Sequence, residues 1–296
     1  MSSWEGLEEI VAIAETGSFV GAARRLNVSP SHVSRIVQRL EHRLKVELFT
    51  RTTRTVRPTE MGRTLVDQSR RIIEERDEAL LMVRGQGEMQ GGLRLTCSTT
   101  LGERFVAPII GRFLMEHPKI SVTLELTNRV IDLVGEDFDV AIRTGHPLDQ
   151  RLAARQIAAR SVISCAAPDY IDRNGRPACP ADLERHECLI GINSTWHFME
   201  GGQRRNLVPA GRLRCNSGAA VVEAALAGMG ICQLPAFYVR DHIHQGRLVA
   251  VLEDHADAPE PIWAVYPQRR YLLPKVQRII AALEAELDDR INPATP

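Results

Sequence analysis

The stretch SFVGAARRLNVSPSHVSRIVQRLEHRL, residues 18–44, decides the fold of the first part of the chain. Its first half predicts a short helix that is capped by Ser18 and ends at Asn27, a residue that tolerates a positive φ. Its second half predicts a helix capped by Ser29, with Pro30 in the first turn, where no N–H is needed. Apolar residues recur at helical spacing in both halves. Two helices joined by so short a turn predict a helix-turn-helix.

The second helix of this motif has a polar face suited to reading DNA bases. In a helix-turn-helix, the N-terminal part of the second helix enters the major groove. Arginine pairs there with guanine, glutamine with adenine, and serine hydroxyls with bases or phosphates. The predicted DNA contacts lie at the cap or on the outward face of this helix: Ser29, Ser31, His32, Ser34, Arg35, Gln38 and Arg39.

A basic hairpin follows this helix. Residues 46–49 alternate as a strand does, 51–54 form a polar turn, and 55–57 return. Such a hairpin forms a wing, and its candidate DNA contacts are the polar residues of the turn: Arg51, Thr53 and Arg54. Arg54 at the tip is placed to approach a minor groove, which favours an inserted arginine where it is narrow.

The charge of the chain is balanced as a whole but not locally. The 296 residues contain 37 basic and 37 acidic side chains, and 44% of them are apolar, as in ordinary globular proteins. Residues 21–57 nevertheless carry nine basic and two acidic side chains, a net charge of +7. Clustered cations bind nucleic acid by releasing the counterions of its phosphates, although a charge run is also common on a merely solvated face.

These residues resemble the N-terminal module of LysR-type transcriptional regulators. The similar segments are AETGSFVGAARRLNVS (14–29), VSR (33–35), RLE (39–41), LFTRTTR (48–54) and PTEMGR (58–63). The resemblance implies an all-α winged helix-turn-helix over residues 1–59 and double-stranded promoter DNA as the partner. It also implies that Ser34 and Arg35 occupy DNA-contacting positions.

Residues 60–90 predict a long linker helix followed by a hinge. Thr59 can cap this helix, and a partial seven-residue apolar pattern runs along it: Leu65, Ile72, Ile73, Ala79, Leu80 and Val83. Such a stripe can pack on its own domain or on a second copy of the chain. The family resemblance implies paired linker helices, hence a dimer, and a tetramer built as a dimer of dimers. The glycines of residues 85–92 indicate the hinge.

After residue 90 the pattern changes to alternating strands and helices, which predicts an α/β fold with parallel sheets covered on both faces. Four further segments are similar to the same family: residues 132–145, 180–183, 226–231 and 246–249. The resemblance implies a two-lobed α/β effector domain over residues 91–296 that resembles periplasmic binding proteins. We expect lobe I to comprise 91–161 with 267–296, and lobe II to comprise 162–266.

A small-molecule effector is expected between the two lobes. In open α/β sheets, ligands bind beyond the carboxyl ends of the strands, where helix N-termini offer N–H donors to anions. The candidate effector contacts are polar residues at such positions: Ser98, Thr99, Thr100, Thr127, Asn128, Arg143, Asn216 and Ser217. Hydroxyls, amides and an arginine suit a small anion such as a carboxylate. The serines and threonines can equally cap the helices that follow them.

The sequence offers no constellation that predicts an enzyme, a metal site or a cofactor. It has no Gly-rich phosphate loop, no H-E-x-x-H and no nucleophile elbow, and the pairs His242/His244 and His186/Cys188 are isolated. The six cysteines form no C-x-x-C pair, so they are expected to be reduced thiols. A redox-sensing Cys97 or Cys165 remains an alternative.

The remaining alternatives concern the compartment and the class of protein. The longest apolar runs are far shorter than a membrane span, and the N-terminus has no basic region leading into an apolar one. A cytoplasmic protein with no membrane partner is therefore expected. The basic N-terminal module argues against a solute-binding protein, and the long second region argues against an architectural DNA-binding protein.

Overall fold

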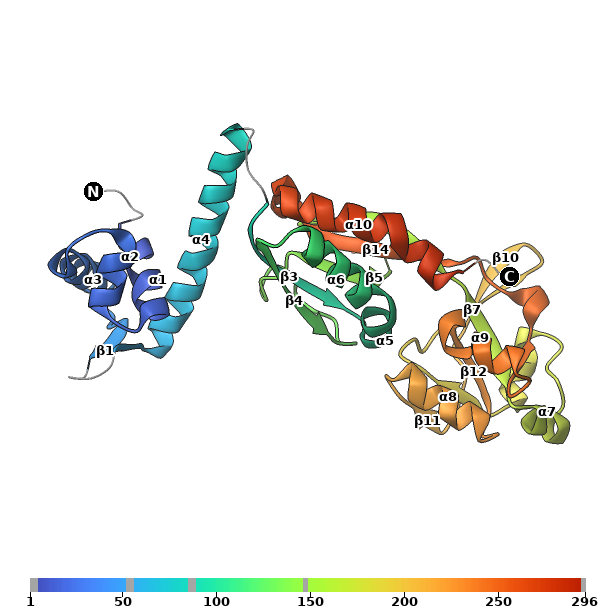
Figure 1. Ribbon diagram of the computed structural model, residues 1–296. Helices are drawn as coiled ribbons and strands as arrows, with labels where there is room; N and C mark the ends of the chain where they lie inside the picture. The colour runs from blue at the N-terminus through green and yellow to red at the C-terminus, as the bar shows by residue number, and fades with distance from the viewer. Residues whose placement is uncertain (1–4, 52–55, 85–88, 146–148, 294–296) are drawn as a thin grey trace. The chain divides into compact units, whose positions relative to one another are not determined.

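The computed structural model describes residues 5–51, 56–84, 89–145 and 149–293. The chain divides into two compact units, Met1–Met89 and Gln90–Pro296, each with its own core (Figure 1).

The N-terminal unit confirms the predicted helix-turn-helix. Its elements are α1 (Leu7–Thr16), α2 (Phe19–Leu26), α3 (Pro30–Leu44), β1 (Phe49–Arg51), β2 (Val56–Pro58) and α4 (Glu60–Arg84). The Ser18 hydroxyl accepts a hydrogen bond from the Gly21 N–H at 3.0 Å, and the Ser29 hydroxyl accepts one from the His32 N–H at 3.2 Å. Asn27, with φ of 55°, ends α2 in the left-handed region. Both expected caps and the turn between them are therefore present.

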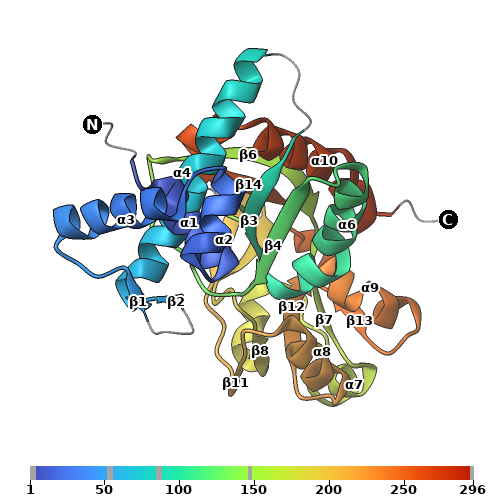
Figure 2. The ribbon, with the colours of Figure 1, turned by 60° about the vertical axis from the view of Figure 1, so that its left-hand side comes forward.

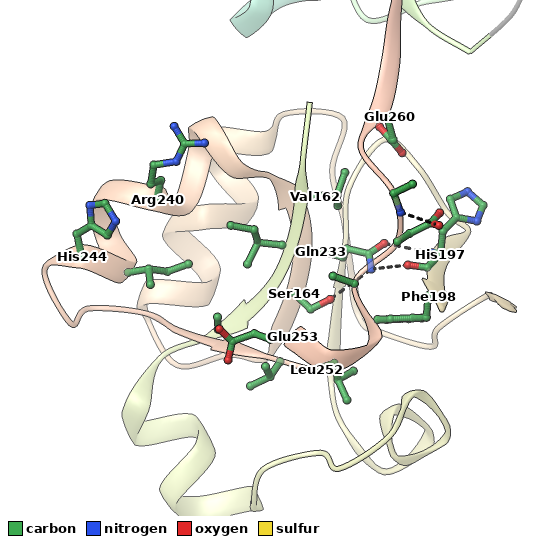
Figure 3. Close-up of a pocket in the computed structure, with 17 residues that line it drawn as sticks. Val162, Ser164, His197, Phe198, Gln233, Arg240, His244, Leu252, Glu253 and Glu260 are labelled. Atoms are coloured by element: carbon green, nitrogen blue, oxygen red, sulfur yellow. Dashed lines mark hydrogen bonds between the residues drawn. The ribbon is translucent and has the colours of Figure 1, made fainter. Parts of the chain in front are cut away.

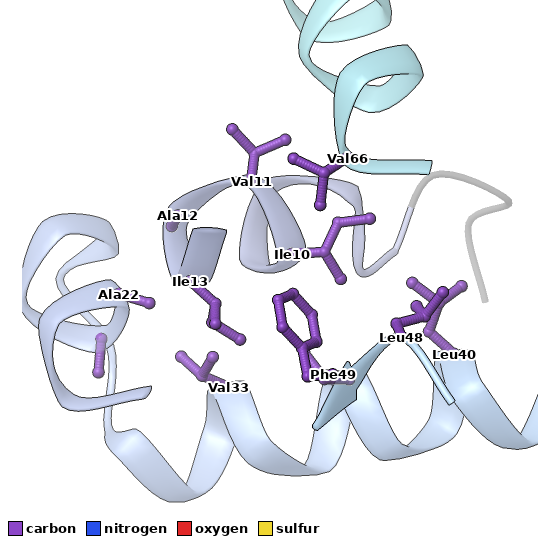
Figure 4. Packing of buried hydrophobic residues seen from close by; sticks show 12 residues of the cluster. Ile10, Val11, Ala12, Ile13, Ala22, Val33, Leu40, Leu48, Phe49 and Val66 are labelled. Atoms are coloured by element: carbon purple, nitrogen blue, oxygen red, sulfur yellow. The ribbon is translucent and has the colours of Figure 1, made fainter. Parts of the chain in front are cut away.

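One apolar core holds this unit together. Ile10 and Ile13 of α1, Val33 of α3, Phe49 of the wing and Val66 of α4 are all buried in it (Figure 4). Burying the apolar side of α3 removes about 25 cal/mol of unfavourable hydration per Å² of apolar surface. Because that side of α3 is committed to the core, its polar side faces outward.

The long helix α4 is fastened to the wing at its first turn. The Thr59 hydroxyl accepts from the Gly62 N–H at 3.0 Å and donates to the Glu47 carbonyl at 2.8 Å, so Thr59 is the predicted cap. A Cβ added to Gly62 would lie 1.9 Å from the Leu48 carbonyl oxygen. Glycine is therefore required by the close approach of the two backbones.

The first lobe of the C-terminal unit is built on a five-stranded sheet in the order β4-β3-β5-β14-β6. Its strands are β3 (Gly91–Cys97), β4 (Ile120–Leu126), β5 (Val140–Thr144), β6 (Leu152–Arg160) and β14 (Glu260–Pro267). Its helical elements are α5 (Thr99–Leu101), the π-helical turn η1 (Gly102–Val106), α6 (Ala107–Glu116), η4 (Gln268–Leu272) and α10 (Pro274–Ile291). Helix α10 packs on β6 and on α6 (Figure 2). Strand β3 lies between β4 and β5.

The second lobe is built on a second five-stranded sheet in the order β11-β8-β12-β7-β13. Its strands are β7 (Val162–Ala166), β8 (Cys188–Ile190), β11 (Leu213–Arg214), β12 (Ile231–Pro235) and β13 (Val249–Val251). A separate hairpin consists of β9 (Trp196–Glu200) and β10 (Gln203–Leu207). The helical elements are α7 (Pro168–Asn174), η2 (Pro180–Arg185), α8 (Gly218–Leu226), α9 (Ala236–His244) and η3 (Glu253–His255).

The two-lobed α/β architecture is confirmed, with two corrections. The sheets are mixed rather than parallel, because β14 runs antiparallel to β5 and β6, and β7 runs antiparallel to β12 and β13. The lobe boundary predicted between 266 and 267 is wrong, since all of β14 lies in the first sheet. The chain crosses to the second lobe after Arg160 and returns before Glu260, so the returning strand β14 pairs antiparallel with β6, the strand that left, and belongs to the first sheet.

Within the described part of the chain, no helix has the length and apolarity that crossing a membrane requires.

We predict that Gly62→Ala lowers the free energy of unfolding of the N-terminal unit by about 3 kcal/mol, because the added methyl group forces α4 away from the wing. Urea unfolding followed by circular dichroism measures the loss. Gly111→Ala is the matched control, since no atom lies within 4 Å of a Cβ there and the helix α6 should gain about 0.5–1 kcal/mol. Equal effects of the two substitutions would contradict the steric argument.

Candidate functional site

The predicted recognition helix presents its polar residues to solvent. Ser29, at the cap, and Ser31, Arg35, Gln38 and Arg39, on the helix, are exposed, whereas His32 and Ser34 are half-buried. The inward side of α3 is formed by the buried residues Val33, Ile36, Val37 and Leu40. The structure therefore places all seven predicted residues of this segment outside the core, at its cap or on its outward side.

Two of these side chains are held by acidic residues near the start of the chain. Arg39 pairs with Glu5 at 3.5 Å, and the His32 imidazole lies 3.9 Å from the Glu9 carboxylate. Arg35 donates from Nε to the carbonyl of Ser31 at 3.3 Å, which directs it along its own helix. Ion pairs at such exposed positions contribute little to stability, so a phosphate can replace the carboxylate at small cost.

The wing depends on a side chain that the sequence did not single out. The Glu41 carboxylate of α3 accepts hydrogen bonds from the N–H groups of Leu48 and Phe49, at 2.8 Å and 3.2 Å. The strand predicted at 46–49 is therefore wrong: β1 begins at Phe49, after a segment bonded to α3. Glu41 belongs to the RLE segment quoted from the sequence. Its partners lie seven and eight residues further along the chain, so no local sequence pattern indicated these hydrogen bonds.

Two of the three predicted wing contacts lie outside the residues that the structure describes. Thr53 and Arg54 fall outside the described residues, and for Arg51 only the backbone is described. The strands on either side pair antiparallel, with Arg51 opposite Val56. The predicted hairpin is present, and the roles of its three polar residues stay predictions.

A cleft of about 600 Å³ lies between the two lobes of the C-terminal unit. Four of the eight predicted effector residues line it: Ser98, Asn128, Arg143 and Asn216. Its first-lobe wall includes the loop after β4, and its second-lobe wall includes residues 191–193, 195 and 196 and the end of β12. The strand ends named from the sequence therefore do meet at one cavity.

The other four predicted residues are not among those that line the cleft: Thr99, Thr100, Thr127 and Ser217. Ser217 accepts from the Ala220 N–H at 3.4 Å and so caps α8. The Thr127 carbonyl accepts from Arg143 at 2.6 Å, and the Thr99 N–H donates to the Asn128 side chain at 3.1 Å. Thr127 and Thr99 therefore bond to the cleft residues Arg143 and Asn128, and Ser217 bonds within its own helix.

Arg143 stands at the end of β5 and is partly buried. Its guanidinium donates to the Thr127 carbonyl and, at 2.8 Å, to the Thr96 hydroxyl. Burial lowers the pKa of Arg143, because the charged form is partly removed from water. Both of these acceptors are neutral, so the hydrogen bonds orient the positive charge without cancelling it.

Asn128 joins the two lobes across the cleft. Its amide oxygen accepts from the Thr99 N–H, and its amide nitrogen donates to the Asn216 carbonyl of the second lobe at 2.8 Å. Arg104 of the π-helical turn also reaches across, to the Phe237 carbonyl. These hydrogen bonds between the lobes therefore depend on the position of one lobe relative to the other.

Several cleft residues were not found from the sequence. Arg160 and Glu260 form an ion pair at 2.8 Å, and Trp196, Phe237 and Tyr238 contribute aromatic surface. The indole N–H of Trp196 is buried without a hydrogen-bond partner among the described residues. These residues lie in four separate segments of the chain, so no local pattern could have grouped them.

The cysteines provide a test of the redox alternative. Cys97 is fully buried, and burial raises its pKa to about 12, so its reactive thiolate form is scarce at neutral pH. Cys165 is also fully buried, with its Sγ 3.6 Å from that of Cys232. Neither thiol has the exposure that a redox sensor needs, which disfavours that alternative.

A DNA-binding helix-turn-helix and a ligand cleft in one chain define a ligand-responsive DNA-binding protein, and comparison with known families makes this specific. Residues 4–63 match the bacterial regulatory helix-turn-helix protein, lysR family, and residues 86–288 match the LysR substrate binding domain. The chain belongs to the LysR family of transcriptional regulators. Proteins of this family found in the comparison are regulators and not enzymes.

Similar relatives cover nearly the whole chain. The HTH-type transcriptional activator AaeR of Escherichia coli K12 is 34% identical over 277 residues, which are 92% of this chain and 89% of AaeR. The HTH-type transcriptional regulator PtxR of Pseudomonas aeruginosa is 34% identical over 286 residues, covering 95% and 92% of the two chains.

Two solved full-length structures have the same architecture. CrgA, a LysR-type transcriptional regulator from Neisseria meningitidis, is 30% identical with a TM-score of 0.58, covering 95% of this chain and 98% of CrgA. The Vibrio cholerae virulence activator AphB is 25% identical with a TM-score of 0.59, covering 95% and 98%.

We predict that Glu41→Ala loosens the wing. Hydrogen bonds to a charged acceptor are worth about 1.5–3 kcal/mol each, so loss of the carboxylate should speed amide exchange at Leu48 and Phe49 by about tenfold or more. Hydrogen exchange followed by NMR measures this. Glu47→Ala, a change at an exposed glutamate beside the wing, is the control and should leave these amides unchanged. Equal exchange in both variants would show that Glu41 does not hold the wing.

Proposed function

We propose that this regulator responds to a small anionic effector held between its two lobes, and that it reads promoter DNA through α3 and the wing. The observation that carries the choice of an anion is that the partly buried Arg143 guanidinium donates its hydrogen bonds to neutral acceptors. DNA reading is assigned to residues 1–59 and effector binding to residues 91–296. The DNA contacts proposed are those named from the sequence. The effector contacts proposed are the four of them that line the cleft, Ser98, Asn128, Arg143 and Asn216, with Arg143 as the principal ligand.

The charges of the cleft support an anion. Three arginines line it, and two of them are neutralised: Arg129 pairs with Glu136, and Arg160 pairs with Glu260. Within the part of the chain that the structure describes, no carboxylate forms an ion pair with Arg143, and Glu125, whose charge acts on Arg143, pairs with Arg129 instead. A partly desolvated cation without a counter-ion is costly, so an effector carboxylate that pairs with it gains a charge-assisted hydrogen bond.

The response to the effector requires two states of the lobes with different affinities for it. The hydrogen bond from Asn128 to the Asn216 carbonyl crosses the cleft beside Arg143, so a ligand there competes with or reinforces it. We propose that this change in lobe closure is passed through the linker to the spacing of two recognition helices.

A dimer is proposed through exposed apolar residues of α4. Leu65 and Ile73, two residues of the predicted stripe, pack on the core of their own unit, as the alternative to dimerisation required. Leu80 and Met61, however, are 52% and 59% exposed. Exposed apolar residues on a long helix support pairing with a second α4, and family resemblance supports a dimer of such dimers.

We predict that Arg35→Ala weakens binding to a duplex selected from a random pool by about 1–3 kcal/mol, while binding to a scrambled duplex changes little. The reason is that Arg35 lies on the N-terminal half of α3, which meets base edges. Competition gel shift at fixed salt measures the ratio of the two affinities.

The matched control for Arg35 is Arg43→Ala, an exposed arginine at the other end of the same helix. It should weaken both duplexes alike if it meets phosphates. An unchanged ratio in Arg35→Ala would remove Arg35 from base reading.

We predict that carboxylates which stabilise the full chain in a thermal-shift screen bind Arg143→Met about tenfold or more weakly, because a charge-assisted hydrogen bond is lost. Shifts are read against each variant's own melting temperature, since Arg143 also bonds to Thr96 and Thr127. Arg129→Met, at an arginine of the same cleft that is already paired, should keep most of the response. A screen that returns only uncharged ligands, or carboxylates indifferent to Arg143, would refute the anionic effector.

A further inference from the structure

A second cavity, of about 300 Å³, lies in the second lobe beside the effector cleft. Its walls come from β7, β9, α9 and residues 250–260 (Figure 3). Val162, Gln233 and Glu260 line both this cavity and the cleft. The two spaces are therefore separated by the thickness of a few side chains.

The walls of this second cavity are mainly apolar. The apolar lining residues are Val162, Ile163, Phe198, Ile243, Ala250, Val251, Leu252, Ala256 and Ala258. Its three carboxylates are each paired with an arginine: Glu253 with Arg176, Asp257 with Arg204, and Glu260 with Arg160. The one other charged side chain among the lining residues, Arg240, donates to the Ile291 carbonyl at 3.4 Å. The walls therefore offer no unpaired carboxylate to a cationic occupant.

One buried hydroxyl gives the cavity a polar anchor. Ser164 is 6% exposed, and its Oγ accepts from Gln233 Nε2 at 3.2 Å. In Figure 3 the two side chains lie between Arg240 and His244 of α9 and the residues of β9. The hydroxyl hydrogen of Ser164 has no acceptor among the residues that the structure describes. A buried donor without an acceptor costs free energy, so the site favours an occupant that accepts a hydrogen bond.

We propose that this cavity is a second small-molecule site, for an uncharged fused two-ring molecule that carries a hydrogen-bond acceptor. A closed apolar cavity of roughly 150 Å³ binds benzene, so twice that volume suits two fused rings. The acceptor, a carbonyl or ring oxygen, binds the Ser164 hydroxyl, and the rings contact the aliphatic walls and Phe198.

Gln233 connects this cavity to the cleft, so an occupant of the cavity can influence the cleft. The Gln233 amide donates to the Ser164 hydroxyl and, at 3.3 Å, to the His197 carbonyl, and it accepts from the His197 N–H at 3.3 Å. His197 follows Trp196, which lines the cleft. An occupant that polarises Ser164 therefore acts on the wall shared with the effector, and any coupling between the two sites is reciprocal.

Equilibrium dialysis of coumarin against the full chain tests the proposal. Coumarin has two fused rings and a carbonyl acceptor, whereas naphthalene has the same shape and no acceptor. We expect saturable binding of one coumarin per chain, weakened about fivefold by Ser164→Ala, because one neutral hydrogen bond is lost. Naphthalene should bind the wild type and Ser164→Ala equally. Ser121→Ala, at an exposed serine of β4, should leave both unchanged.

Two further variants separate this site from the effector cleft. Ala250→Leu fills the cavity without removing a hydrogen bond of Gln233, so it should weaken both probes. Arg143→Met should leave coumarin binding intact, whatever it does to the proposed effector. Coumarin binding that is lost in Arg143→Met and kept in Ser164→Ala would place the molecule in the cleft and overturn the proposal. Absence of saturable binding at millimolar coumarin would overturn it as well.

Discussion

The two-lobed unit depends on the point where the chain crosses between its two sheets, and the ion pair between Arg160 and Glu260 lies at that crossing. Arg160 ends β6, the strand after which the chain leaves the first sheet, and Glu260 begins β14, the strand on which it returns. The two residues are direct partners across the strands, and Arg160 donates to one Glu260 oxygen from both Nε and Nη2, at 3.0 Å and 2.8 Å. Removing one partner of a pair this buried leaves an uncompensated charge, at a cost of about 3–5 kcal/mol.

That crossing explains why the cleft exists and why its chemistry is selective. The chain passes between the two sheets through neighbouring strands, which leaves a space lined by both lobes, and these strands contribute Arg160 and Glu260 to its wall. Since these two charges satisfy one another, Arg143 is the residue to which the proposed recognition of an anion is assigned. The same wall, through Gln233, separates the cleft from the second cavity. A rearrangement at the crossing therefore reaches both spaces.

The N-terminal unit follows a similar logic on a smaller scale. The apolar side of α3 is buried in the core, and its polar side faces outward, where DNA can bind. Glu41 lies between the two faces and binds the segment that leads into the wing. One helix thus orients both elements that are proposed to meet the duplex. Gly62 allows the next helix to approach the same segment closely.

The sequence by itself determined the helix-turn-helix, its caps at Ser18 and Ser29, and the α/β class of the second unit. These features follow from hydrogen bonds within three or four residues and from the period of apolar positions. Only the tertiary structure decided that β14 joins the first sheet, that Arg160 meets Glu260, and which candidate effector residues line the cleft. Such contacts join positions a hundred residues apart, and they depend on packing and strand pairing that no local pattern encodes.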